Sequence, residues 1–487
     1  MQGLLGWASH HSRCGLGCFC LTVHPWRFKL PAQVVQLKRR AGSYAEALAA
    51  YKDGNISGCL DLLLGQRDFQ ASSLRARAYN RLGRPASALQ EMAVIDNPAS
   101  HLRRGEQAVI RMSALNKLRR FEEATAISGD VRPYIFGAVC APLEAEFEFY
   151  VALLHFSQRD TQAASEAAVR VFEVDSSPFE RNDYFAPLVV TQALALELLG
   201  LIEARRERYA GQAAHLRDAL QVLERSRVRD SYVFVSLLAN LSFIVRDLDF
   251  ESDAQYVRSQ LPNILWNQDL ESKRFHILRS LGWCSALRGD HLAAFRDFRQ
   301  ASESTATIPL KILAALDRVQ LSRELHEGGL ANDELATAED LSLRVDWEMV
   351  MSEDRTVLLA LSREVAAVSP ARARRAYDRY CSIKSKLSPQ FLADSDRRSR
   401  ADQAVAHASV LRSEGEVNRA TLLLEEAFQI YDQVGYRWRA AGVAIELAQL
   451  TSHERYLNYA QAEASARPHS WMARRVFSLE LGELVSA

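Results

Sequence analysis

The chain of 487 residues is 48% hydrophobic and 25% charged, a composition that excludes extended disorder for most of its length. Its 60 basic residues equal its 60 acidic residues, which argues against nucleic acid as the main partner, because phosphate binding normally needs a basic excess. The seven cysteines are scattered and odd in number, so they do not form a disulfide framework, and a cytoplasmic location is expected.

Residues 1–40 are predicted to be an irregular N-terminal leader, because glycines and prolines interrupt any helical period there. This segment holds the one cluster of potential zinc ligands, which comprises His10, His11, Cys14, Cys18 and Cys20. The cluster lacks the paired C-x-x-C spacing of structural zinc sites. We therefore expect no metal site in it.

Helical repeats are predicted over residues 41–387. The clearest copy runs from Leu278 to Ala301, with the sequence LRSLGWCSALRGDHLAAFRDFRQA. Small residues at Gly282 and Ala294 are expected to let two helix backbones approach closely. Gly289 is expected to end the first helix in a left-handed conformation, and Asp290 to cap the second. This pattern resembles the tetratricopeptide repeat.

Weaker copies occur at residues 74–95, 109–128, 149–171 and 404–428, with degenerate copies between them. The predicted turns lie at residues 83, 119, 159, 207, 248, 289, 328, 369 and 415. Their mean spacing is near ~40 residues, somewhat longer than the ~34 of the standard repeat. Strand-type alternation is absent, so we predict an all-α, right-handed superhelical solenoid of about nine tetratricopeptide-like helix hairpins.

Residues 388–487 are predicted to form the C-terminal hairpins and a capping helix. Within them, the stretch from Leu422 to Leu450, LLLEEAFQIYDQVGYRWRAAGVAIELAQL, resembles the helical sensor region of the maltose-regulator-like, LuxR-type bacterial transcriptional regulators. Those regulators also carry a phosphate-binding NTPase domain and a DNA-binding helix-turn-helix domain. The sequence lacks a Gly-Lys-Ser/Thr triplet, and too little chain follows the hairpins for a DNA-binding domain. The resemblance therefore implies a sensing scaffold only.

No catalytic site, cofactor site or metal site is predicted, and the protein is expected not to be an enzyme. The motifs G-x-G-x-x-G, G-x-S-x-G and H-E-x-x-H are all missing. No run of about 18 apolar residues is present, so no membrane-spanning helix is expected. An enzyme on this scaffold would need polar side chains gathered from several repeats, which a sequence alone does not reveal.

The concave face of a helical solenoid is lined by the first helix of each pair. Positions just past the small contact residues, and one turn further on, are predicted to face this groove; they are Arg77, Asn80, Ser113, Asn116, Arg279, Trp283 and Arg412. Arginine and tryptophan are frequent anchors of binding partners. The alternative for each position is plain surface or core, and Trp283 then packs against a neighbouring repeat.

Two functions are compatible with these observations. The first is a non-enzymatic scaffold that binds a protein or peptide ligand, in bacterial regulation. The second is the sensor part of a LuxR-type transcriptional regulator that lacks its own NTPase and DNA-binding domains. Neither a membrane nor direct contact with nucleic acid is expected, and the oligomeric state stays open.

Overall fold

The computed structural model describes residues 44–95, 100–135, 141–174, 185–228, 230–248, 251–347, 356–385 and 397–480. Every regular element in these ranges is a helix, which confirms the predicted all-α repeat fold. The expected leader, residues 1–40, and its candidate zinc ligands lie outside the described residues.

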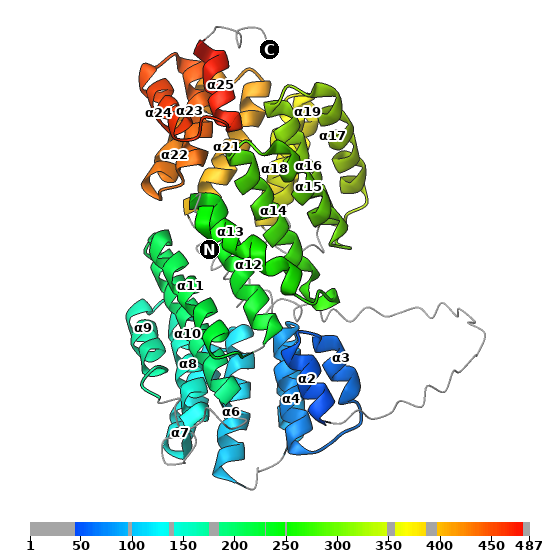
Figure 1. Cartoon of the computed structure of the whole chain (residues 1–487), viewed down its shortest axis with the longest axis vertical. Helices are drawn as coiled ribbons and strands as arrows, with labels where there is room; N and C mark the ends of the chain where they lie inside the picture. The colour runs from blue at the N-terminus through cyan, green and yellow to red at the C-terminus, as the bar shows by residue number, and fades with distance from the viewer. Residues whose placement is uncertain are drawn as a thin grey trace, which may run out of the picture.

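The α-helices of the described ranges form eleven pairs and one closing helix (Figure 1), and two short 3₁₀ helices, Leu261–Asn263 and Gln268–Leu270, lie between the sixth and seventh pairs. The first helices of the pairs are α2 (Tyr44–Lys52), α4 (Phe69–Arg81), α6 (His101–Lys117), α8 (Ala141–Ser157), α10 (Phe185–Arg205), α12 (Ser231–Leu248), α14 (Glu271–Leu287), α16 (Ile308–Glu324), α18 (Thr356–Ala366), α21 (Arg397–Ser413) and α23 (Arg437–Thr451). The second helices are α3 (Ile56–Leu62), α5 (Pro85–Ala93), α7 (Phe121–Ile135), α9 (Thr161–Arg170), α11 (Tyr209–Arg225), α13 (Glu251–Gln260), α15 (His291–Glu303), α17 (Gly328–Leu343), α19 (Pro370–Ser385), α22 (Val417–Gln433) and α24 (Glu454–Ala466). The closing helix is α25 (Trp471–Glu480).

All nine predicted turns lie at or beside the junction between the two helices of a pair. The two further pairs are α2–α3 and α23–α24, near the two ends of the described chain. Helices on either side of residues 386–396 still pack together, since α21 contacts both α18 and α19. A division of the repeats at residues 387 and 388 stays a prediction.

Eight of the turns within the pairs share one backbone geometry, a residue with positive φ followed by an N–H that donates five residues back, although their sequences differ. Gly289 has a φ of 83°, in the left-handed region, and the next N–H, of Asp290, donates to the carbonyl of Ser285 at 3.0 Å. Arg159 occupies the same place with a φ of 70°, and Asp160 donates to His155 at 3.0 Å. This is the helix-ending motif that glycine favours. Because several turns hold a larger residue there, the repeats look degenerate in sequence.

Packing in the clearest repeat differs in one respect from the expectation. A β-carbon added at Gly282 would lie 2.5 Å from the ring of Phe298, so this glycine makes room for an aromatic ring rather than for a backbone. Ala294 is fully buried, in a cluster that includes Trp283 and Phe298. Asp290 caps the second helix as predicted, since its carboxylate accepts the N–H of Ala293 at 3.0 Å.

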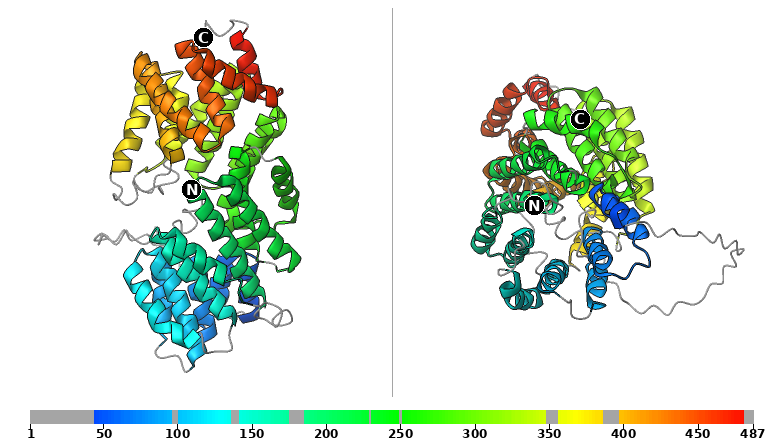
Figure 2. Two further views of the ribbon diagram at one scale, coloured as in Figure 1. Left: turned by 90° about the vertical axis from the view of Figure 1, so that its left-hand side faces the viewer. Right: turned by 60° about the horizontal axis from the view of Figure 1, so that its bottom comes forward.

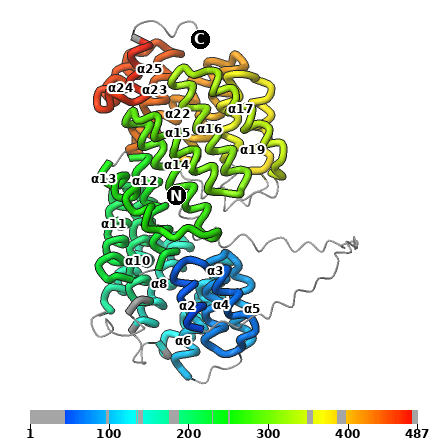
Figure 3. The backbone as a smooth tube through the Cα atoms, turned by 45° about the vertical axis from the view of Figure 1, so that its right-hand side comes forward, coloured from blue at the N-terminus to red at the C-terminus, as the bar shows by residue number. Residues whose placement is uncertain are grey.

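Helix α12 contacts hairpins that are far away in the sequence at both of its ends (Figures 2 and 3). Before its first turn, Asp230 pairs with Arg81 of α4 at 2.6 Å, across 149 residues. Near its last turn, Asp247 pairs with Arg439 of α23 at 3.3 Å, across 192 residues. The superhelix therefore makes two successive turns, and α12 forms part of the wall of both.

Two helices are long and apolar enough to cross a membrane by length and composition, with candidate segments Pro187–Arg205 and Ser231–Leu248. These segments are 61% and 78% buried inside the fold. They belong to α10 and α12, which pack against α8, α11, α13 and α14. Burial against neighbouring helices accounts for their apolar character.

Substituting Ala294 by arginine should lower the free energy of unfolding by about 3 kcal/mol or more, because it overpacks a full core and buries a charge. Leu292→Arg is the matched control on the same helix, since Leu292 is 81% exposed. Thermal and urea unfolding of both variants would measure the difference. Equal stability of the two variants would contradict the tight packing at Ala294.

Candidate functional site

The second superhelical turn encloses a cavity of about 780 Å³, which we call the inner cavity. Its walls are the first helices α12, α14, α16, α18, α21 and α23, together with parts of α11, α19, α22 and α25. The volume lies within the range of roughly 300–1,000 Å³ that is typical of ligand clefts. The cavity therefore has room for a short segment of chain or a small molecule, and not for a folded domain.

Charged and aromatic side chains dominate the wall. Its basic residues are Arg246, Lys273, Arg279, Arg323, Arg363, Arg398, Arg412, Arg439 and Arg475. Its acidic residues are Asp247, Asp317, Glu324, Glu364, Asp402 and Glu446. Its tryptophans and tyrosines are Tyr209, Trp283, Tyr380, Tyr431, Tyr436, Trp438 and Trp471.

Asp247 is the centre of the most buried charge group, which we call the Asp247 cluster. This carboxylate is 1% exposed and contacts three arginines: Arg246 at 3.0 Å, Arg398 at 2.6 Å and Arg439 at 3.3 Å. Arg439 also donates to Asp402 at 2.8 Å. Burial by itself raises the pKa of Asp247, but the three guanidinium groups hold that pKa well below its ordinary value. The cluster joins α12 to α21 and α23.

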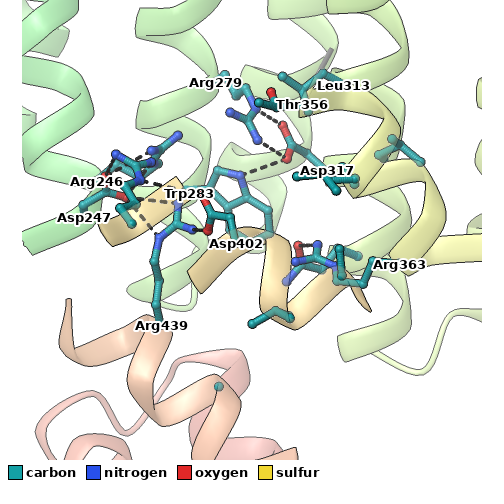
Figure 4. Close-up of a pocket in the computed structure, with 18 of the residues that line it drawn as sticks. Arg246, Asp247, Arg279, Trp283, Leu313, Asp317, Thr356, Arg363, Asp402 and Arg439 are labelled. Carbon is teal, nitrogen blue, oxygen red and sulfur yellow. Dashed lines mark hydrogen bonds and ion pairs between the residues drawn. The ribbon is translucent and has the colours of Figure 1, made fainter. Parts of the chain in front are cut away.

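A second group joins α14 and α16 (Figure 4). Arg279 and Asp317 form an ion pair, and the indole N–H of Trp283 donates to the same carboxylate at 3.1 Å. The Trp283 ring stacks on Trp438 of α23, with ring centroids 6.0 Å apart. Arg439 of the Asp247 cluster lies over the Trp438 ring, 5.1 Å from its centroid, so the two stacked indoles connect the two charge groups (Figure 4).

Further arginines line the opposite wall. Glu364 of α18 accepts from both Arg323 at 2.7 Å and Arg363 at 2.9 Å, which connects α16 with α18. Arg412 of α21 contacts Glu446 of α23 at 3.4 Å, a long and partly exposed pair. Each of the six first helices thus contributes at least one arginine to the wall.

A buried carboxyl lies behind the wall, where α10, α12 and α14 meet. Glu197 of α10 is 4% exposed and accepts from the side-chain amide of Asn240 at 2.6 Å. Burial raises the pKa of Glu197 to about 7. Burial also lowers the pKa of Lys273 to about 8, while the nearby Glu197 acts in the opposite direction. Asn240 and Lys273 both line the inner cavity.

The structure brings three of the predicted partner-binding residues together: Arg279, Trp283 and Arg412 all line the inner cavity. The other four, Arg77, Asn80, Ser113 and Asn116, lie on α4 and α6 in the first superhelical turn. Arg77 pairs there with Glu146 at 2.9 Å. Asn80, Ser113 and Asn116 are 2–6% exposed and contact neighbouring helices rather than an open surface. A role in partner binding stays a prediction for all seven.

Sequence reasoning missed the Asp247 cluster altogether. Arg439 and Asp247 are 192 residues apart, so no local repeat pattern joins them. The available signal was Arg246-Asp247 near the end of the apolar helix SYVFVSLLANLSFIVRDL, where two charges need buried partners. Within the described ranges, no group of three or more His, Cys, Asp or Glu side chains is placed to hold a metal ion.

Replacing Asp247 by asparagine should lower the free energy of unfolding by about 3–5 kcal/mol, because the buried Arg246 loses its carboxylate partner, and Arg398 and Arg439 are left to share Asp402. The matched control is Asp340→Asn, which removes an exposed pair with Arg344 and should cost less than about 0.5 kcal/mol. Urea unfolding measures both effects, and limited proteolysis shows whether α21–α25 detach. Equal stabilities of the two variants would rule out a structural role for the cluster.

Replacing Glu197 by glutamine should flatten the dependence of stability on pH. The folded-state pKa of about 7 lies above the unfolded value, so the stability linked to this group is full at low pH and is lost as pH rises through about 7. Lys273 has a folded-state pKa of about 8 and stays largely charged up to about pH 7, so the comparison is made below that pH.

Between about pH 5 and 7, the wild type should therefore lose roughly 2 kcal/mol relative to the glutamine variant. Urea unfolding at a series of pH values is the measurement. The exposed Glu166→Gln variant is the control and should follow the wild-type profile. Parallel profiles for Glu197→Gln and the wild type would contradict the raised pKa.

Comparison with known proteins gives solved structures only. No family model matches this chain, and no curated protein matches it. The apo form of the quorum sensor NprR from B. thuringiensis is 11% identical, with a TM-score of 0.42, and the match covers 74% of this chain and 97% of that chain. A Rap protein complexed with competence and sporulation factor is also 11% identical, with a TM-score of 0.38 and coverages of 86% and 100%. The APC/C hetero-tetramer Cut9-Hcn1 is 13% identical, with a TM-score of 0.29 and coverages of 89% and 94%. At these values the likeness concerns the helical-repeat fold alone.

Proposed function

We propose that this protein is a non-enzymatic scaffold whose inner cavity binds a short segment of a protein or peptide. The observation that supports the proposal is the 780 Å³ cavity walled by six successive first helices. A solenoid presents its concave side to partners. Here that side forms a cavity open to solvent and lined by arginine and tryptophan, the residue types that most often anchor partners.

The contacts within the wall favour binding over catalysis. Asp247, Asp317 and Glu364 each form close ion pairs with arginine. A carboxylate held in this way is an acceptor in a structural network and is poorly suited to proton transfer at neutral pH. The arginines and indole rings of the wall offer hydrogen-bond donors and flat apolar surfaces, which suit the carbonyl groups and side chains of an extended peptide.

A second candidate is the sensor part of a bacterial transcriptional regulator that acts through a DNA-binding domain on another chain. The sequence from Glu425 to Ala441, which resembles LuxR-type regulators, spans α22 and α23. Its residues Tyr436, Trp438 and Arg439 belong to the cavity wall. A helix-turn-helix protein that is encoded beside this chain and binds it only with peptide present would favour this candidate over a general scaffold.

The proposal is tested by affinity selection from a randomised library of short peptides. The wild type should retain a defined set of peptides. Ala360→Trp, which places an indole into the cavity from α18, should lose them. Ala371→Trp is the matched control, because Ala371 is exposed on the outer helix α19, and it should retain the same set. Retention by Ala360→Trp, or no retention by the wild type, would refute cavity binding.

A further inference from the structure

The inner cavity carries more positive than negative groups, although the whole chain is neutral. Nine arginine and lysine side chains line it, against six carboxylates. Several arginines share one carboxylate. Asp247 forms ion pairs with three arginines, and Glu364 forms ion pairs with two. Each guanidinium group has five N–H donors. The wall therefore has many more donors than its own carboxylates can accept.

Among the residues that the structure describes, two indole groups beside the cavity have unpaired N–H donors that are themselves buried. Trp438 and Trp471 line the cavity and are 8% and 2% exposed, and their ring N–H groups have no hydrogen-bond partner within the described part of the chain. A buried indole N–H usually finds an acceptor. Arg412 is a further available donor, since its contact with Glu446 is 3.4 Å long and its side chain is 43% exposed.

The electrostatic surroundings of Arg246 agree with this reading. Burial lowers its pKa to about 10; Asp247 acts in the opposite direction, and the nearby Arg398, Arg439 and Arg279 lower the pKa further. A guanidinium group normally stays charged at any accessible pH. Arg246, Arg398 and Arg439 thus share Asp247 and Asp402, so basic groups outnumber acidic groups in this part of the wall.

Resting on the proposed function, we infer that the inner cavity selects acidic peptide segments, whose carboxylates are bound by the arginines of the wall. The arginines are spread over α12, α14, α16, α18, α21 and α23 rather than gathered at one point. A dispersed array matches a chain with several carboxylates better than one small anion. Guanidinium groups bind carboxylates in a planar, two-point geometry, which gives direction as well as charge.

The test uses the full-length protein and the same library of short peptides, sequenced after selection. The retained set should be enriched in Asp and Glu and depleted in Lys and Arg. Resynthesised peptides with every Asp and Glu changed to Asn and Gln should bind at least about tenfold more weakly, as expected for the loss of a charge-assisted hydrogen bond. Binding should weaken further as salt is raised.

Two variants on helix α21 test whether acidic peptides bind inside the cavity. Arg412→Gln should weaken the binding of acidic peptides about tenfold. Arg400→Gln, also on α21, should leave it unchanged, because Arg400 lies outside the cavity and pairs with Glu426 at 3.2 Å. Competition with inorganic phosphate and with free glutamate distinguishes a peptide site from a site for small anions.

Each other outcome is decisive. A retained set that is neutral or basic, or an equal loss in Arg400→Gln, overturns the acidic preference while peptide binding itself stands. Displacement by free glutamate at the same carboxylate concentration as the peptide assigns the site to small anions and also overturns the inference. If the wild type retains no peptide at all, both the proposed function and the inferred preference for acidic peptides are wrong.

Discussion

The structure depends on the placement of one helix, α12, between two superhelical turns. Asp230, just before this helix, pairs with Arg81, and Asp247, near its end, pairs with Arg398 and Arg439. Between these charges α12 is almost wholly buried, so it cannot shift along its axis without exposing apolar surface or separating ion pairs. Because both turns close against the same helix, their geometry is coupled, and the inner cavity is held open between walls that are already fixed.

Buried ion pairs of this kind are better explained by specificity than by stability. Desolvation offsets much of the Coulomb attraction in a buried pair, whereas a missing partner is strongly destabilising. The Asp247 cluster therefore distinguishes the correct seating of α21 and α23 on α12 from a seating shifted by one helical turn, which would leave charges unpaired. The stack of Trp283 on Trp438 and the fit of Gly289 against the backbone of His469 constrain the same junction without charge. A preformed wall lowers the ordering cost of binding a ligand.

The sequence predicts the helical repeat, but it does not predict the contacts that join distant hairpins around the inner cavity. The nine turns and the cap at Asp290 follow from local patterns of small residues, turns and helix caps, and such patterns act over a few residues. The turns at Arg159 and Glu207 were harder to recognise, because a non-glycine residue there adopts the left-handed conformation that glycine usually supplies. Contacts such as Asp247 with Arg439 depend on the summed curvature of several hairpins. The sequence of one repeat does not determine the curvature of several repeats together. The cavity and its charge pattern are therefore seen only in the three-dimensional structure.

The charge pattern of the inner cavity also helps to explain why its wall contains so many arginines. Apolar residues at these positions would join the helices of the wall with a smaller desolvation penalty. Stability alone therefore does not account for nine basic side chains around six carboxylates. Sites that keep like charges close together are usually retained for function at some expense of stability. Arg398 and Arg439 both hold α12 and face the cavity, so any anion that contacts them also contacts the junction of α12 with α21 and α23. Occupancy of the cavity and closure of the second superhelical turn are therefore linked through the same guanidinium groups.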